Sequence, residues 1–180
     1  MDTSFLRKVP LFEGLSDEDL EAIAKVTISR TYDKDQIIIL AEEEGDALFI
    51  IESGQVKVSI VSEDGREAIL SLLGNGAVFG ELSLLDGKPR SANVVATENT
   101  GLYMVRRADF LQLIYKVPKI AIALLAELAA RLRKTDRKIE GLALLDVTSR
   151  ISETLLQLAT DQGEQGEEGI YLASRPTHQQ

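Results

Sequence analysis

The spacing of apolar residues along the chain changes twice and divides it into three parts. Residues 1–29 have the periodicity of a helix, with an apolar stripe that starts at Leu20. Ser16 is placed to cap this helix, and Asp19, three residues later, completes a short capping box. The period then becomes two, as in strands, and returns to that of a helix in the last third of the chain.

The middle part, from about residue 30 to 105, alternates apolar and polar residues in short runs. Clusters of Gly, Asp, Asn and Pro separate the runs, as turns would. Many short strands with no helix between most of them indicate a mainly β unit with flanking helices: a jelly roll or double-stranded β-helix barrel rather than a βαβ sheet. The expected strands are residues 36–40, 48–51, 55–60, 68–73, 92–96 and 101–105.

After this β unit, Asp109 is expected to cap a short helix that ends at Tyr115, and Pro118 suits the first turn of a long helix. Along the long helix, one stripe repeats in alternating steps of four and three, which is the a/d pattern of a coiled coil. The alternative is an amphipathic helix packed on its own barrel, but such a helix has a wider stripe, so a parallel homodimer is favoured. The seam positions are Ala121, Leu125, Leu128, Leu132, Thr135, Ile139 and Leu142.

The last forty residues predict a further, incomplete unit. Residues 142–159 are expected to form a helix with Asp146 near its start, residues 161–169 a loop, and residues 170–172 a short strand. Thr177 and the residues after it have the pattern of a new capping box. Because a helix would then begin at the last residues, we expect the chain to be a shortened form of a longer protein.

Composition removes several classes of function. The 180 residues include no cysteine and a single histidine, His178, so a disulfide scaffold and cysteine chemistry are excluded, and neither a metal site nor a Ser-His-Asp triad is expected. A net charge of -9 argues against the chain as a whole binding nucleic acid. No apolar run approaches the roughly 20 residues that a spanning helix needs, so we expect a cytoplasmic protein without a membrane segment.

Residues 79–92 carry the candidate chemistry. Gly80 permits close approach of a ligand to the backbone, and the helical turn expected after it presents free N–H groups to an anion. Arg90 can bind a phosphate through two parallel hydrogen bonds, and Glu81 can accept hydrogen bonds from a sugar hydroxyl. Phosphate plus ribose indicates a nucleotide. The alternative is an ordinary β-hairpin with an excursion, in which Glu81 and Arg90 pair with each other.

The same segment resembles the phosphate-binding cassette of cyclic nucleotide-binding domains, with its Phe-Gly-Glu-Leu, Leu-Leu, Gly and Pro-Arg-Ser-Ala elements. Residues 9–16 are similar to the usual beginning of such domains. Residues 144–151 resemble the hinge and first DNA-domain helix of the bacterial cyclic-AMP receptor protein (catabolite activator) and fumarate-nitrate regulator family. The resemblance implies a cyclic nucleotide-binding barrel with N-terminal helices at 1–116, a dimerisation helix at 117–142, and the hinge and start of a winged helix-turn-helix at 143–180.

The family resemblance also implies a set of ligand-binding residues. Thr135 would reach the base, although threonine is also an ordinary occupant of a seam. Asp136 stands where the cyclic-AMP receptor has a base-contacting serine, and a carboxylate only accepts hydrogen bonds; alternatively, Asp136 faces solvent and pairs with Arg133 or Arg137. Cyclic AMP is the effector expected first, with cyclic GMP possible. The implied contacts in the cassette are Gly80, Glu81, Leu82, Arg90, Ser91 and Ala92.

Two classes of function follow from this reading. The first is an effector-gated transcription regulator, in which the ligand repositions a C-terminal helix-turn-helix that binds DNA in the parent protein. The second is a stand-alone nucleotide-binding or dimerisation module that regulates a protein partner; a family member that senses a non-nucleotide ligand is a further possibility. An enzyme is not expected, because Glu81 has no second carboxylate or histidine for acid–base chemistry. No cofactor is expected.

Overall fold

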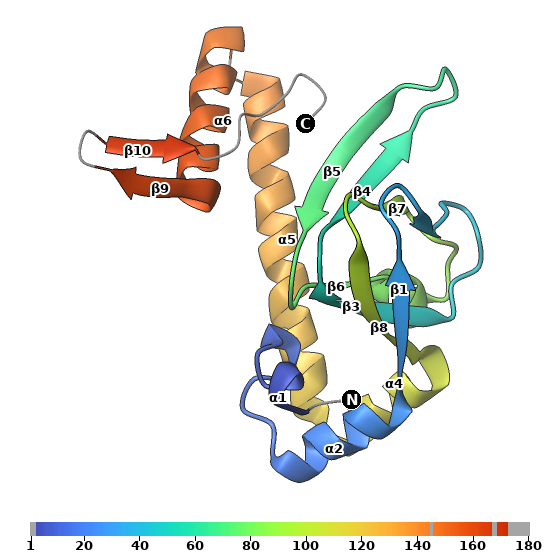
Figure 1. Cartoon of the computed structure of the whole chain (residues 1–180). Helices are drawn as coiled ribbons and strands as arrows, with labels where there is room; N and C mark the ends of the chain where they lie inside the picture. Colours follow the sequence, from blue (N-terminus) through green and yellow to red (C-terminus); the bar gives the residue numbers. More distant parts are fainter. Residues whose placement is uncertain (1–2, 145, 167–168, 173–180) are drawn as a thin grey trace. The chain divides into compact units, whose positions relative to one another are not determined.

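The computed structural model describes residues 3–144, 146–166 and 169–172. The chain forms two compact units, residues 1–127 and 128–180, and the boundary lies inside the continuous helix α5 (Pro118–Leu144). Figure 1 shows the β-barrel and its short helices in the first unit, and a helix with a β-hairpin in the second.

The first unit begins with helices, continues as a barrel and returns to helices. Its helices before α5 are α1 (Thr3–Leu6), the short 3-10 helix η1 (Pro10–Phe12), α2 (Asp17–Val26), α3 (Glu81–Asp86) and α4 (Arg107–Lys116). Its strands are β1 (Thr27–Tyr32), β2 (Ile37–Ile39), β3 (Ala47–Ser53), β4 (Val56–Val61), β5 (Glu67–Leu73), β6 (Val78–Phe79), β7 (Asn93–Ala96) and β8 (Thr100–Arg106).

These strands form two antiparallel sheets, in the orders β1-β8-β3-β6 and β2-β7-β4-β5. Side chains from both sheets meet in one apolar core, where the rings of Phe49 and Phe79 stack with centroids 5.2 Å apart. Residues 47–51 of β3 are all buried, so both faces of that strand are covered. Two facing antiparallel sheets make the jelly roll that the alternating pattern predicts, and the predicted fold class is confirmed.

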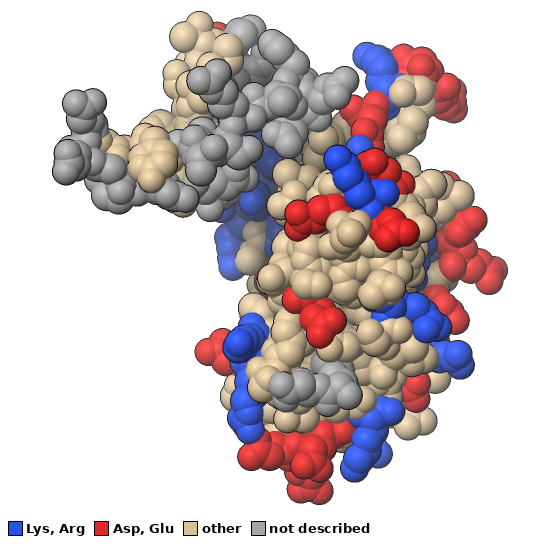
Figure 2. Space-filling view, in the orientation of Figure 1, with Lys and Arg blue, Asp and Glu red and all other residues tan. Residues whose placement is uncertain are grey.

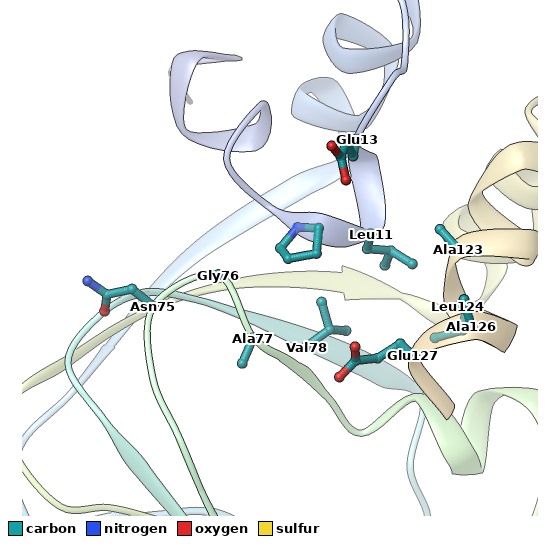
Figure 3. Close-up of a pocket in the computed structure, with 11 residues that line it drawn as sticks. Leu11, Glu13, Asn75, Gly76, Ala77, Val78, Ala123, Leu124, Ala126 and Glu127 are labelled. Atoms are coloured by element: carbon teal, nitrogen blue, oxygen red, sulfur yellow. The ribbon is translucent and has the colours of Figure 1, made fainter. Parts of the chain in front are cut away.

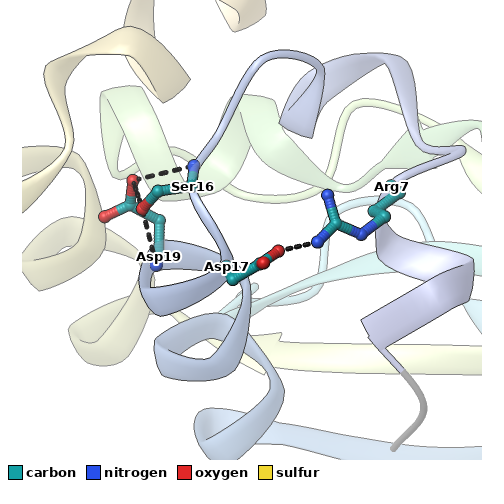
Figure 4. Close-up of polar contacts among 4 residues, drawn as sticks. All are labelled: Arg7, Ser16, Asp17 and Asp19. Carbon is teal, nitrogen blue, oxygen red and sulfur yellow. Dashed lines mark hydrogen bonds and ion pairs between the residues drawn. The ribbon is translucent and has the colours of Figure 1, made fainter.

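The N-terminal cap of α2 is the one predicted from the sequence (Figure 4). The Ser16 hydroxyl accepts from the Asp19 N–H at 3.2 Å, and the Asp19 carboxylate accepts from the Ser16 N–H at 3.3 Å. An ion pair between Arg7 and Asp17 joins the segment after α1 to the first turn of α2. The apolar stripe of α2 buries Leu20 and Ile23 against the rest of the first unit.

Two boundaries of the expected helices are wrong. The first helix was expected to run to residue 29, but it ends at Val26, because residues 27–32 pair with β8 as the strand β1. Asp109 does not cap α4, which begins at Arg107 with Arg106 in the cap position. β8 ends at Arg106 and α4 begins at the next residue, so Asp109 falls within the first turn of α4. The Arg107 N–H at this junction donates to the Asp46 carbonyl at 2.6 Å.

The long helix α5 begins at Pro118 as predicted, and two of its faces are apolar. Ile120 and Leu124 are buried in the first unit. Leu125, Leu132 and Ile139 lie seven residues apart and are 66%, 62% and 58% exposed. The helix therefore packs on its own barrel through one face and leaves seam positions exposed on another. Leu142, the last seam position, lies outside the residues whose side chains the structure describes.

The second unit contains α6 (Val147–Gln162) and the antiparallel strands β9 (Gly163–Gly166) and β10 (Gly169–Leu172). Asp146 caps α6 by accepting from the Ser149 N–H at 2.8 Å, as the sequence indicates. The expected strand at 170–172 is confirmed. The expected loop at 161–169 is wrong over 161–166 and at 169. α6 continues to Gln162, and β10 begins at Gly169. Pairing with β10 makes a strand of residues 163–166 despite their low strand propensity. The capping box predicted at Thr177, His178 and Gln180 lies outside the described residues.

Charged side chains of both signs are mixed over the face shown in Figure 2. Acidic residues gather at the start of α2, where Asp17, Glu18 and Asp19 occupy the first turn. The described part of the chain contains no helix that is both long and apolar enough to span a membrane.

Replacing Gly54 by alanine should destabilise the barrel more than the same change at Gly65. Both glycines have positive φ, +89° and +83°. A Cβ at residue 54 would lie 2.6 Å from the Asn99 carbonyl oxygen, whereas a Cβ at residue 65 would meet nothing within 4 Å. We expect urea unfolding to give a loss of about 1–2 kcal/mol for Gly65→Ala and a loss larger by at least about 1 kcal/mol for Gly54→Ala. Equal losses would contradict this role of Gly54.

Candidate functional site

The cassette predicted at residues 79–92 folds as a strand end, a short helix and a loop. β6 ends at Phe79, Gly80 turns the chain with φ of +80°, and α3 follows as the expected helical turn. Gly87, with φ of +71°, ends α3, and the loop after it leads to β7. Positive φ at both ends of α3 favours glycine at these two positions, because a side chain there would be strained.

The guanidinium of Arg90 lies inside this turn. Arg90 is only 7% exposed, and two of its nitrogens donate to the carbonyls of Gly80 and Ala47, both at 2.7 Å. Its backbone pairs with the loop before β3: the Arg90 N–H donates to Glu43 at 2.8 Å, and its carbonyl accepts from Glu42 at 2.9 Å. Arg90 thus joins the cassette to residues 42–47, which lie more than forty residues before it in the sequence.

Two glycines make room for the Arg90 side chain. A Cβ on Gly45 would lie 2.2 Å from the Arg90 Nε, and a Cβ on Gly80 would lie 2.8 Å from one of its terminal nitrogens. Neither distance is possible for real atoms, so Arg90 occupies its position only because residues 45 and 80 lack side chains. Gly45 lies in one of the turn clusters between the expected strands, and its contact with Arg90 spans 45 residues of sequence, so no local pattern could have indicated that contact.

The electrostatics of the site follow from this burial. Burial lowers the pKa of the Arg90 guanidinium, and the negative charges of Asp46 and Glu81 raise that pKa in part. Glu81 is 3% exposed. A guanidinium keeps its charge under all ordinary conditions, so the site holds a buried cation close to a buried carboxyl group. Such a pair can bind a ligand that offers an anion on one side and hydroxyl donors on the other.

A second arginine positions the helix of the cassette. The Arg107 Nε donates to the Leu84 carbonyl at 2.9 Å, while the Arg107 backbone N–H binds the Asp46 carbonyl. Asp46 is adjacent to Ala47, one of the acceptors of Arg90. The start of α4 is therefore held to both α3 and the loop that surrounds Arg90.

The remaining predicted site residues occupy different environments. Ala92 is buried, Ser91 is exposed, and Leu82 is 45% exposed on α3. Thr135 and Asp136 belong to the second unit, and both are exposed on α5. The Thr135 hydroxyl donates to the Arg131 carbonyl one turn earlier, at 3.0 Å. The structure thus brings Gly80, Glu81 and Arg90 together, and the parts of Thr135 and Asp136 in a ligand site stay predictions.

The first unit also contains a cavity of about 710 Å³ (Figure 3). None of its lining residues belongs to the cassette at 79–92. Leu11 and Val78 contribute apolar walls, and Glu13 and Glu127 contribute carboxylates. The cavity is formed by η1, the turn before β6 and the first turns of α5. It is therefore distinct from the Arg90 site.

The fold and the cassette define a class of protein. Residues 29–116 match the family described as the cyclic nucleotide-binding domain. The chain is 38% identical over 149 residues to the "Cyclic AMP receptor protein" of Thermus thermophilus, an alignment that covers 83% of this chain and 69% of that protein. The chain belongs to the cyclic-AMP receptor protein family of transcriptional regulators. It contains the regulatory, cyclic nucleotide-binding region of that family.

Solved structures agree with this assignment. The catabolite activator protein of Thermus thermophilus superposes with a TM-score of 0.69 at 38% identity, over 83% of this chain and 70% of that one. The c-di-GMP responsive global regulator CLP of Xanthomonas campestris superposes with a TM-score of 0.72 at 26% identity, over 81% of this chain and 73% of that one. The shared architecture therefore extends beyond the cassette.

Gly45→Ala should displace the Arg90 guanidinium. The new Cβ would overlap the flexible arginine side chain, which has to move and give up its bonds to Gly80 and Ala47. Loss of these charge-assisted bonds should lower the free energy of unfolding by about 1–3 kcal/mol, measured by urea denaturation. Gly74→Ala is the control, because a Cβ there meets nothing within 4 Å. If both variants unfold like the wild type, the guanidinium bonds do not stabilise the unit.

Proposed function

We propose that the chain binds a cyclic nucleotide in the cassette, with Arg90 on the cyclic phosphate and Glu81 on the ribose. The observation that supports this most directly is the buried guanidinium, which has neutral carbonyls as its hydrogen-bond partners at Gly80 and Ala47. An anionic acceptor is a stronger partner for a guanidinium than a neutral carbonyl. The two free oxygens of a cyclic phosphate match the two-pronged geometry of the guanidinium.

The other cassette residues complete the proposed ligand contacts. Glu81 would accept from a ribose hydroxyl, Ser91 would offer its exposed hydroxyl, and Gly80, Leu82 and Ala92 would contribute backbone and surface to the ligand. Cyclic AMP is the first candidate, since the Thermus relative is named for it. Cyclic GMP and cyclic di-GMP are the further candidates to titrate, the latter because the Xanthomonas regulator is described as responding to it.

The proposed output is a change in the position of α5. Arg90 contacts Ala47, and the adjacent Asp46 is bonded to Arg107 at the start of α4, one element before α5. A ligand that draws Arg90 away from these carbonyls would shift the loop that holds α4. As a homodimer in the cytoplasm, the protein would pass this shift to a DNA-binding helix-turn-helix, whose hinge and first part we assign to residues 143–180. This proposal assigns the protein no catalysis and no resident cofactor.

Arg90→Ala should abolish most of the cyclic nucleotide affinity. Removing one member of a desolvated charge pair costs on the order of 2–5 kcal/mol of binding free energy. Isothermal titration calorimetry with cyclic AMP, cyclic GMP and cyclic di-GMP measures this directly. Arg66→Ala is the control, because Arg66 lies in the exposed turn between β4 and β5 and pairs with Asp64.

Arg90→Lys separates charge from geometry. It keeps the cation but loses the fork of donors, so its affinity should lie between those of the wild type and Arg90→Ala. Unchanged affinity in Arg90→Ala, with circular dichroism like that of the wild type, would refute the phosphate role. Absence of binding to all three nucleotides in the wild type would refute the proposed ligand class.

Leu132→Glu should convert the proposed dimer into a monomer. Leu132 is 62% exposed, so glutamate should leave the fold of the subunit intact while placing two charges in the seam. Ile37→Glu is the matched control, because Ile37 is 60% exposed on β2 in the barrel. Light scattering should give a dimer for the wild type and Ile37→Glu and a monomer for Leu132→Glu. A dimer in all three would show that α5 is not the interface.

A further inference from the structure

The cavity in Figure 3 has walls that the fold of the first unit fixes. The turn before β6 is tied to β3 by two hydrogen bonds. The Gly76 N–H donates to the Ile51 carbonyl at 2.8 Å, and the Ile51 N–H donates to the Ala77 carbonyl at 3.0 Å. On the side of α5, Leu124 is 3% exposed, so the first turns of this helix are anchored in the unit. The cavity therefore has a preformed shape, as most small-molecule sites have.

The size and lining of the cavity suit a small organic molecule. Its volume of about 710 Å³ lies within the range of ~300–1,000 Å³ that such sites occupy. Leu11, Val78 and Leu124 contribute apolar side chains, and Gly76 and Ala123 leave the space between them open. An apolar body that displaces water from these walls gains free energy from the burial of its surface.

The charge of the lining selects against anions. Glu13 lines the cavity from the end of η1, and Glu127 lines it from α5 (Figure 3). The eleven lining residues all belong to the described part of the chain, and none of them is Lys, Arg or His. Glu127 already interacts with another group of the chain. We therefore assign the contact with a positive charge to Glu13 alone.

Glu13 is placed to receive a cation. Its side chain makes no hydrogen bond or ion pair with any residue that the structure describes. Its backbone N–H donates to the Pro10 carbonyl at 3.2 Å, which closes η1. Leu11 and Phe12, just before it, are 6% and 3% exposed and hold this backbone in place. The carboxylate is thus available while the chain that carries it is fixed.

We propose that this cavity is a binding site for a small organic cation, with an apolar body of about the size of an indole and one ammonium group. The body would lie against Leu11, Val78 and Leu124, and the ammonium group would pair with Glu13. Such a ligand would contact η1 and α5 at once and hold the two together. The site needs neither the nucleotide nor the second subunit of the proposed function, because all its residues lie in the first unit and outside the cassette.

Tryptamine is the probe that tests this site, because its indole supplies the apolar body and its amine the charge. The 180-residue chain contains no tryptophan, so the fluorescence anisotropy of the indole reports binding directly. Tryptophol, with a hydroxyl, and indole-3-propionate, with a carboxylate, are the matched neutral and anionic probes. Tryptamine should bind about two- to fivefold more tightly than tryptophol, and indole-3-propionate should bind most weakly. The preference for tryptamine should shrink as ionic strength rises from about 0.05 M to about 0.5 M.

Two substitutions test the two parts of the proposal. Glu13→Gln removes the charge and keeps the size, so it should lower the affinity for tryptamine to that for tryptophol and leave tryptophol unaffected. Glu63→Gln, in the exposed turn between β4 and β5, is its control. Ala123→Leu should fill part of the cavity and weaken the binding of all three probes. Ala130→Leu is its control, because Ala130 is exposed on the same helix and does not line the cavity.

The outcomes separate this site from the Arg90 site. Arg90→Ala should leave tryptamine binding unchanged, so a failure of nucleotide binding and a failure of amine binding are independent results. Equal affinities for tryptamine and tryptophol would overturn the assignment of a cation, and so would an undiminished preference for tryptamine in Glu13→Gln. Unchanged binding in an Ala123→Leu variant that folds, as judged by circular dichroism, would overturn the cavity as the site. Absence of tryptamine binding at millimolar concentration would overturn the whole inference.

Discussion

The Arg90 guanidinium lies in the interior of the first unit, where a cation is tolerated only if its donors have acceptors. The carbonyls of Gly80 and Ala47 supply them, and each comes from a different segment: the end of β6 and the start of β3. This one requirement explains why residues 45 and 80 have no side chain and why the loop before β3 runs beside the cassette. Through Asp46 and Arg107, the same loop also sets where α4 begins.

Much of this fold is predictable from the sequence because its strands are short, alternate regularly and are separated by turn residues. Two strands that the pattern does not predict take their conformation from the strand beside them. Residues 27–29 continue a helical pattern, yet they pair with β8, more than seventy residues later. Residues 163–166 have a loop composition, yet they pair with β10 in a local hairpin. In both cases, pairing with another strand overrides local propensity.

The sequence likewise predicts some residues of the candidate site and not others. Gly80, Glu81 and Arg90 lie within a segment of fourteen residues, so the chemistry of the segment and its family pattern both indicate them. The acceptor at Ala47 and the space at Gly45 lie more than forty residues before Arg90 in the sequence, and a backbone carbonyl cannot be recognised from the sequence. On α5, the regular spacing indicates the exposed stripe, but the burial of Ile120 and Leu124 on a neighbouring face is visible only once the helix lies on the barrel.

The two carbonyls that hold Arg90 also set a threshold for any anion that approaches it. An incoming anion gains only the difference between its own bonds to the guanidinium and those already made with Gly80 and Ala47. A small inorganic anion has nothing else to offer, so that difference is most of its binding energy. A larger molecule that also engages Glu81 and Ser91 adds contacts beyond those with the guanidinium. Selection among the abundant phosphates of a cell would then depend on the number of simultaneous contacts rather than on charge.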